Sequence, residues 1–163
     1  MVADIINYSS VRVAEEKYLK SQGFLYKKTT SNSEKVAGLA AALASDPNYA
    51  EIKGASSGKV IGVFDKQRVP GYDSNQLLSD YYARDGFPVD IIIPYTKATP
   101  VRAYISASQT IAKFDKLIVD NGGTFSKYES TGTVVAIALE AITTTGSPDL
   151  IEILLLPIWH SEV

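Results

Sequence analysis

The chain has 163 residues, which suits one domain with an appendage, because single domains commonly span about 100 to 150 residues. Hydrophobic residues make up 45% and charged residues 21%, values that exclude the disordered and fibrous classes. With 16 basic and 18 acidic side chains the formal charge is -2, so no overall field favours nucleic acid or an anionic membrane. The absence of cysteine excludes disulfides and thiolate metal sites or nucleophiles.

The N-terminal stretch MVADIINYSS lacks a basic flank followed by a sustained apolar core. The longest apolar run, residues 153–158, is too short to cross a bilayer. We therefore expect neither a secretion signal nor a membrane anchor.

Residues 1–57 are rich in Ala, Ser, Lys and Asn, whereas most β-branched clusters follow a boundary near Ser56-Ser57-Gly58. A capping box at 31–34 and apolar residues at helical spacing predict a helix that stops at Ser45-Asp46-Pro47. Residues 11–22 are typical of either a short helix or a strand. Two interpretations of residues 1–57 stay open: a helical flank packed on the main domain, or an arm that lies across neighbouring subunits.

Residues 58–163 are predicted to form mainly β structure, a small barrel or sandwich with short helices. One amphipathic helix is expected at 73–84, and no internal repeat is recognised. Pro88, Pro94 and Pro100 lack ladder donors and should lie near strand ends or sheet edges. The expected strands are 60–64, 89–94, 99–106, 117–119, 125–128, 134–139 and 150–156.

The stretch 111–141 has the most explicit sequence pattern, that of three short strands joined by turns. A β-rich run at 116–119 precedes Asp120-Asn121-Gly122-Gly123, which predicts a tight hairpin, and a strand rich in Val, Ala, Ile and Leu follows Gly132. The order of these motifs over 99–157, ending in Leu-Leu-Pro, resembles the signature of tailed-phage capsid decoration proteins. Phe114 and Ala136 stand where proteins of this kind tend to carry glycine.

The resemblance implies a non-enzymatic virion protein of a bacteriophage, with residues 1–57 as extension and 58–163 as the decoration domain. Such a protein is made in the bacterial host cytoplasm and cements the outer capsid surface. Its partners would be the major capsid protein and copies of itself, most often in a homotrimer, with no nucleic acid and no membrane. The alternative is a β-barrel binding module of another phage structure, namely a tail, a fibre base or a carbohydrate-recognising head fibre.

No catalytic, cofactor-binding or metal-ligating residue is predicted, and no cofactor is expected. His160 is the only histidine, and the pairs Asp85 with Asp90 and Asp115 with Asp120 stand in turns, where carboxylates commonly accept backbone hydrogen bonds. A small hydrolase or isomerase working through these carboxylates is the least favoured hypothesis, because no nucleophile, base and orienting group can be named together.

The ten tyrosines leave a further choice open, since each ring suits both a core and a protein contact. Tyr81, Tyr82, Tyr95 and Tyr104 either fill the core with their hydroxyls at its rim or face a partner. The apolar run 154–159 is either a central strand or a seam between subunits.

Overall fold

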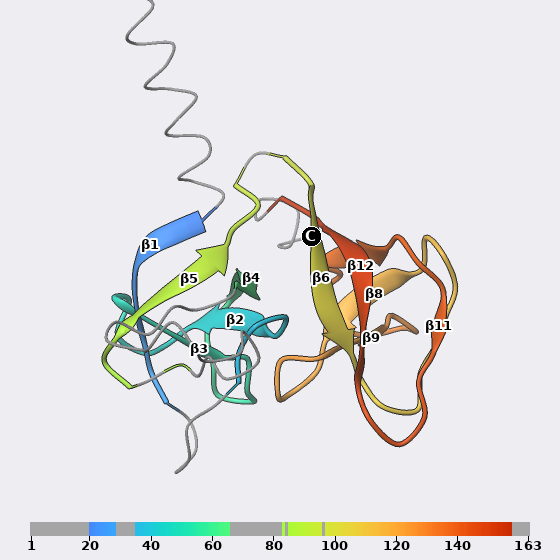
Figure 1. The fold of residues 1–163 in the computed structure, drawn as a ribbon, viewed down its shortest axis with the longest axis horizontal. Coiled ribbons are helices and arrows are strands. Elements are labelled where there is room, and N and C mark those ends of the chain that lie inside the picture. The colour runs from blue at the N-terminus through green and yellow to red at the C-terminus, as the bar shows by residue number, and fades with distance from the viewer. Residues whose placement is uncertain (1–19, 29–34, 66–82, 84, 96, 158–163) are drawn as a thin grey trace, which may run out of the picture.

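The computed structural model describes residues 20–28, 35–65, 83, 85–95 and 97–157. Every regular element in these ranges is a β-strand, so the expected mainly β class is confirmed. The strands form two small closed barrels that lie side by side in Figure 1, together with a separate two-stranded sheet. Within the same ranges, no helix has the length and hydrophobicity needed to span a membrane.

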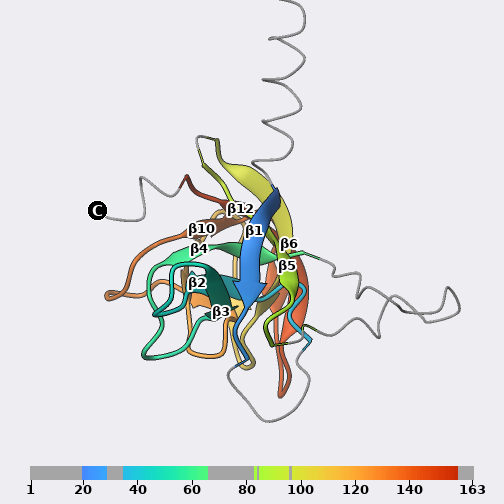
Figure 2. The same ribbon diagram turned by 90° about the vertical axis from the view of Figure 1, so that its left-hand side faces the viewer.

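The first barrel has the strand order β1-β3-β2-β4-β5 and closes between β5 and β1. Its β1–β3 pair is parallel and its other pairs are antiparallel. The boundary expected between residues 57 and 58 falls in the loop that joins two strands of this barrel. The five strands, which face the viewer in Figure 2, are β1 (Lys20–Tyr26), β2 (Ala40–Leu43), β3 (Tyr49–Ile52), β4 (Val60–Phe64) and β5 (Pro88–Ile92).

The second barrel has the order β10-β12-β6-β9-β8 and closes between β8 and β10. All seven strands expected from the sequence are present in one barrel or the other. The small sheet pairs β7 (Thr110–Ile111) with β11 (Ile142–Thr143). The barrel strands are β6 (Thr99–Ile105), β8 (Lys116–Val119), β9 (Phe125–Lys127), β10 (Ala136–Ala138) and β12 (Asp149–Leu155).

The two barrels share one strand plan. When each barrel is numbered in chain order, both follow the cyclic order 1-3-2-4-5, and the first and third strands form the single parallel pair in each. The correspondence therefore runs from β1 to β6, from β2 to β8, from β3 to β9, from β4 to β10 and from β5 to β12. The interpretation that the chain has no internal repeat was wrong at the level of structure.

Hydrogen bonds repeat residue by residue around the second strand of each barrel. The N–H of Gly38 donates to the Phe64 carbonyl at 2.9 Å, and at the corresponding place Phe114 donates to Ala138 at 2.8 Å. The return bonds, Phe64 to Leu39 and Ala138 to Asp115, are both 2.9 Å. Strand register makes Gly62 correspond to Ala136. Both positions that depart from the decoration-protein pattern thus have a glycine counterpart in the first barrel.

The helix predicted to end before Pro47 is wrong in its described part, where residues 40–43 form β2. Gly38 has a positive φ of 84°, a left-handed conformation that a continuing α-helix does not contain. Ala40, Ala41 and Ala42 are all completely buried, because β2 has neighbouring structure on both of its faces. The helix expected at 73–84 lies outside the described residues except for residue 83, and so does most of 11–22, whose last residues belong to β1.

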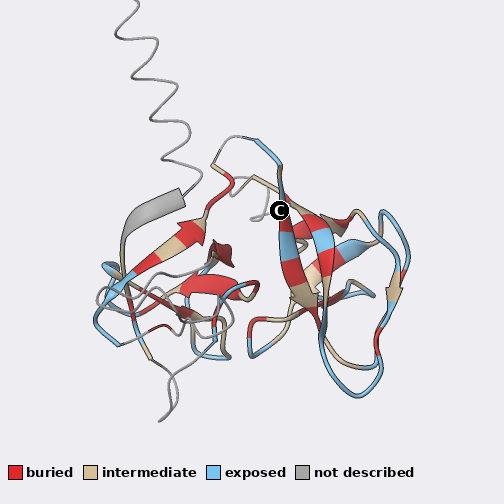
Figure 3. Ribbon diagram, viewed as in Figure 1, coloured by how far each residue is buried: buried red, intermediate tan, exposed pale blue. Residues whose placement is uncertain are grey.

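The barrel interiors are apolar and the outer faces mixed, as alternation along a strand requires. Figure 3 shows this alternation along β6 and β12, where buried and exposed residues follow one another. In the first core, the rings of Tyr26 and Phe64 meet edge to face with centroids 5.8 Å apart. Ala40 and Val63 of the first barrel instead pack into the core of the second, so the two cores adjoin.

Backbone hydrogen bonds also join the two barrels. The Ala40 N–H donates to the Gly123 carbonyl and the Gly122 N–H donates to the Lys53 carbonyl, both at 2.7 Å. Tyr104 donates to the Gly38 carbonyl at 3.0 Å. The tip of the β8–β9 hairpin, whose turn was predicted from its glycines, therefore fastens the second barrel to the first.

Replacing Phe114 by glycine should stabilise the protein. Phe114 has a φ of 73° and its ring is 68% exposed, so the left-handed backbone is strained while the side chain buries little area. The substitution relieves about 1–2 kcal/mol of backbone strain, but glycine also gives the unfolded chain more conformational freedom. We therefore expect the free energy of unfolding to rise by about 0.5–1 kcal/mol. Equilibrium urea unfolding measures this gain.

The corresponding position in the first barrel supplies the control. Gly38→Ala should lower the free energy of unfolding by at least about 1 kcal/mol, since a Cβ there adopts the same strained φ. It would also approach Tyr104 and Leu150 within 3.1–3.3 Å. If the two substitutions changed the free energy of unfolding in the same direction, the assigned equivalence of Phe114 and Gly38 would be contradicted.

Candidate binding cleft between the barrels

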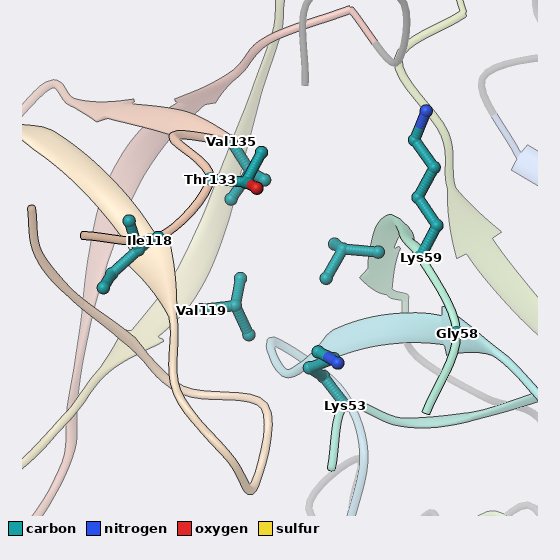
Figure 4. Close-up of a pocket in the computed structure, with 9 residues that line it drawn as sticks. Lys53, Gly58, Lys59, Ile118, Val119, Thr133 and Val135 are labelled. Carbon is teal, nitrogen blue, oxygen red and sulfur yellow. The ribbon is translucent and has the colours of Figure 1, made fainter. Parts of the chain in front are cut away.

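A cleft of about 240 Å³ opens where the two barrels meet. Its walls come from the β3–β4 loop and β4 on one side, and from β8 and the segment before β10 on the other (Figure 4). Gly58 and Gly132 are corresponding residues of the two barrels, so equivalent loops line the cleft from opposite sides. The lining residues are Lys53, Gly58, Lys59, Val60, Ile118, Val119, Gly132, Thr133 and Val135.

The first barrel contributes the charge of the cleft and the second contributes most of its apolar surface. Lys53 and Lys59 lie on one side in Figure 4, and Ile118, Val119 and Val135 lie on the other. Among the described lining residues, none is acidic. This combination favours a ligand that carries an apolar group beside a carboxylate or another anion.

The β3–β4 loop is held in shape by its own polar contacts. Lys53 Nζ donates to the carbonyls of Gly54 at 3.0 Å and Ser57 at 3.3 Å. The Ser57 hydroxyl donates to Glu51 Oε1 at 2.6 Å, and Glu51 is buried. The position of the Lys53 ammonium is thus fixed by the loop, which makes this side of the cleft pre-organised.

A second hollow, of about 310 Å³, is polar and lies on the second barrel beside Asp120 and Ser126. Asp120 accepts hydrogen bonds from the Ser106 hydroxyl at 2.5 Å and from the Ser126 hydroxyl at 2.8 Å. Ser106 also lies 2.8 Å from the Thr124 hydroxyl. One carboxylate oxygen of Asp120 therefore ties the end of β6 to the hairpin turn, and the other joins that turn to β9.

Of the carboxylates considered as catalytic pairs, Asp85, Asp115 and Asp120 lie in or beside turns, whereas Asp90 lies in β5, so the turn expected at that residue was wrong. Asp85 accepts the Lys28 N–H at 2.9 Å, and Asp115 accepts the Ala112 N–H at 2.8 Å. The structure holds Asp115 and Asp120 in separate hydrogen-bond networks. No group of three or more His, Asp or Glu side chains suited to a metal occurs within the described ranges.

Lys127 donates to Asp115 across 2.9 Å, and this bond, followed by the one from Ala112, lowers the pKa of Asp115 below 3.8. A depressed pKa contributes stability that is present above the unfolded-state pKa and lost as the pH falls through the folded-state value. Asp115→Asn should therefore be less stable than the wild type at pH 7, by a small amount because the pair is partly exposed. Urea unfolding from pH 7 to pH 2 should show the two proteins converging below about pH 4. A gap that persists at pH 2 would contradict the linkage.

Of the other residues singled out from the sequence, some lie within the part of the chain that the structure describes and others lie outside it. Tyr95 is half-buried and packs against the first core, and the half-buried Tyr104 lies over Gly38 at the barrel junction. Tyr81, Tyr82 and His160 lie outside the described residues. The run 154–159 begins in β12, which lies between β10 and β6 and is thus a central strand.

The sequence was also compared with protein-family models and with curated proteins. No family model matches the chain, and no curated protein matches it. The resemblance to capsid decoration proteins therefore stays a prediction.

Sequence reasoning did not single out the cleft residues Lys53, Lys59, Ile118 and Thr133. One signal could have pointed to them, because the run Gly58-Lys59-Val60 recurs as Gly132-Thr133-Val134 at corresponding places. Only the packing of one barrel on the other brings these two runs to a common cleft.

Proposed function

We propose that this chain is a capsid decoration protein that binds the outside of a bacteriophage head and cements it. The two barrels would serve as a rigid block that bridges neighbouring capsid subunits. Self-association, most often as a homotrimer in the family that the chain resembles, would multiply the contacts each assembly makes.

The recurrence of one strand plan in both barrels, with glycine at two corresponding positions of the first, is the observation that supports this proposal most. The motif order that resembles decoration proteins was recognised in residues 99–157, which make up the second barrel. The first barrel repeats its strand plan and carries Gly38 and Gly62 where the second has Phe114 and Ala136. The glycine positions of the family pattern are therefore positions that this barrel uses structurally.

The construction of the molecule suits a mechanical role. The barrels adjoin through shared apolar packing and through backbone hydrogen bonds, so a load applied to one is passed to the other. Closed barrels also leave few unpaired strand edges, which limits unintended association at high local concentration.

Co-sedimentation tests the proposal. The purified full-length chain is mixed with undecorated heads of its own phage at successive stages of maturation, and the pellets are analysed for bound protein. Saturable binding at a fixed ratio to the major capsid protein, together with greater resistance of the heads to heat or chelators, is the expected result. Absence of binding at every stage of maturation would refute the proposal.

The same preparation addresses the alternative, a binding module of a tail, fibre base or head fibre. Binding to tails or to a glycan array, with no binding to heads, would support that alternative. Gly123→Ala, which disturbs the junction of the barrels, serves as the control. Loss of head binding in this variant would show that binding needs the rigid two-barrel block, and unchanged binding would show that one barrel alone binds.

A further inference from the structure

The cleft between the barrels lies directly beside the point where the described chain ends. Leu156 donates its N–H to the Val135 carbonyl at 2.9 Å, and Val135 lines the cleft. A small hollow lined by Leu155 and Leu156 also includes Val60 and Val135, two residues of the cleft wall. The described part of the chain therefore ends at the rim of the cleft.

We propose that residues 158–163 of the same chain bind in this cleft and fasten the two barrels together. The segment reads Ile-Trp-His-Ser-Glu-Val, with two large apolar side chains first and one carboxylate later. Six extended residues reach at most roughly 20 Å. A segment of this length can place Ile158 and Trp159 beside Val135, where the described chain ends. It can also bring Glu162 to the side of the cleft that carries Lys53 and Lys59.

The chemistry of the segment complements that of the cleft. Ile118, Val119 and Val135 offer apolar contact to the indole and the isoleucine, because apolar area removed from water drives such docking. Lys53 and Lys59 provide two positive charges for the carboxylate of Glu162. A volume of about 240 Å³ exceeds the roughly 150 Å³ of a cavity that accommodates benzene, so an aromatic ring can enter.

Trp159 makes the proposal directly measurable, because it is the only tryptophan in the sequence. Its fluorescence in the full-length protein should lie at shorter wavelength than that of N-acetyltryptophanamide, and acrylamide should quench it less. Emission like that of the free compound would overturn the proposal.

Two substitutions at exposed positions of the cleft locate the site. Thr133→Arg should crowd the opening, and Lys59→Glu should repel Glu162; both should shift the emission to longer wavelength while the far-ultraviolet circular dichroism stays unchanged. The effect of Lys59→Glu should be reversed by adding Glu162→Lys, and it should weaken at high salt. Lys113→Glu, an exposed charge reversal outside the cleft lining, is the matched control and should leave the emission unchanged.

Two outcomes would contradict the proposal even if the emission of the wild type is shifted. A shift that none of the cleft variants alters would place Trp159 elsewhere on the molecule. A shift that disappears on dilution, in parallel with a falling light-scattering mass, would assign the cleft to the segment of a second copy rather than to the same chain.

Discussion

Among the described glycines, Gly62 is the one whose replacement by alanine should destabilise the protein most. A Cβ at Gly62 would overlap the carbonyl oxygen of Ile92 and lie 3.1 Å from Cγ2 of Ile91. The overlapping atom belongs to the backbone of the neighbouring strand β5, so no rotamer change can relieve it. We expect a loss of about 3–4 kcal/mol in the free energy of unfolding, measured by urea denaturation.

Gly146→Ala is the matched control, because a Cβ there meets no atom within 4 Å and the residue is exposed. It should change stability by no more than about 0.5 kcal/mol. The second barrel provides an internal comparison, since the corresponding residue is already Ala136 and is fully buried. Similar losses for Gly62→Ala and Gly146→Ala would mean that β4 and β5 can separate without cost.

The later strands were predictable because their composition and turns agree. β4, β5, β6, β8, β9, β10 and β12 consist mostly of apolar or alternating residues, and most of them have Gly, Pro, Asp or Ser close to an end. The prolines marked the ends correctly: Pro88 opens β5, Pro100 is the second residue of β6, and Pro94 follows β5. Local chemistry was sufficient for these elements.

The strands before residue 58 escaped prediction because their residues favour other structures in isolation. β2 is Ala-Ala-Ala-Leu, a sequence of high helix propensity. It is a strand because small side chains are needed where β2 lies between its own barrel and the core of the second. Tertiary packing overrides propensity here, and nothing local in the sequence reveals that packing.

The repeat was hidden because corresponding positions exchange large and small residues. In the first barrel the parallel pair joins Tyr26 to Ala50, whereas in the second it joins Ile105 to Phe125. The aromatic residue of this pair thus comes from the first strand in one barrel and from the third strand in the other. Such exchanges keep both positions apolar while residue identity is lost, which suits a core but defeats recognition by sequence.

The cleft was unpredictable for a related reason. Its two walls come from loops far apart in the sequence, and their meeting depends on the hairpin tip that contacts the first barrel. Gly122-Gly123 was correctly assigned to a turn, but its contact with β2 and with Lys53 has no sequence signal. A glycine that appears to serve only a turn can thus also be required for the junction of two barrels.

Gly123→Ala should loosen that junction. Gly123 has a φ of 82°, and an added Cβ would lie 2.9 Å from Cγ2 of Ile52 and 3.2 Å from the Ala40 carbonyl oxygen. Backbone strain of about 1–2 kcal/mol adds to the cost of displacing the first barrel, so we expect a total loss of about 3 kcal/mol. The hydrogen bond from Ala40 to Gly123 would lengthen or break.

Gly122→Ala separates the two contributions, because Gly122 also has a positive φ, 102°, yet a Cβ there meets nothing within 4 Å. It should cost only the backbone strain, about 1–2 kcal/mol. The difference between the variants then measures the fit of the hairpin tip against the first barrel. We also expect Gly123→Ala alone to split the unfolding into two transitions, since barrels that no longer support each other unfold separately. Equal losses for the two variants, with one shared transition, would show that the barrels are held together elsewhere.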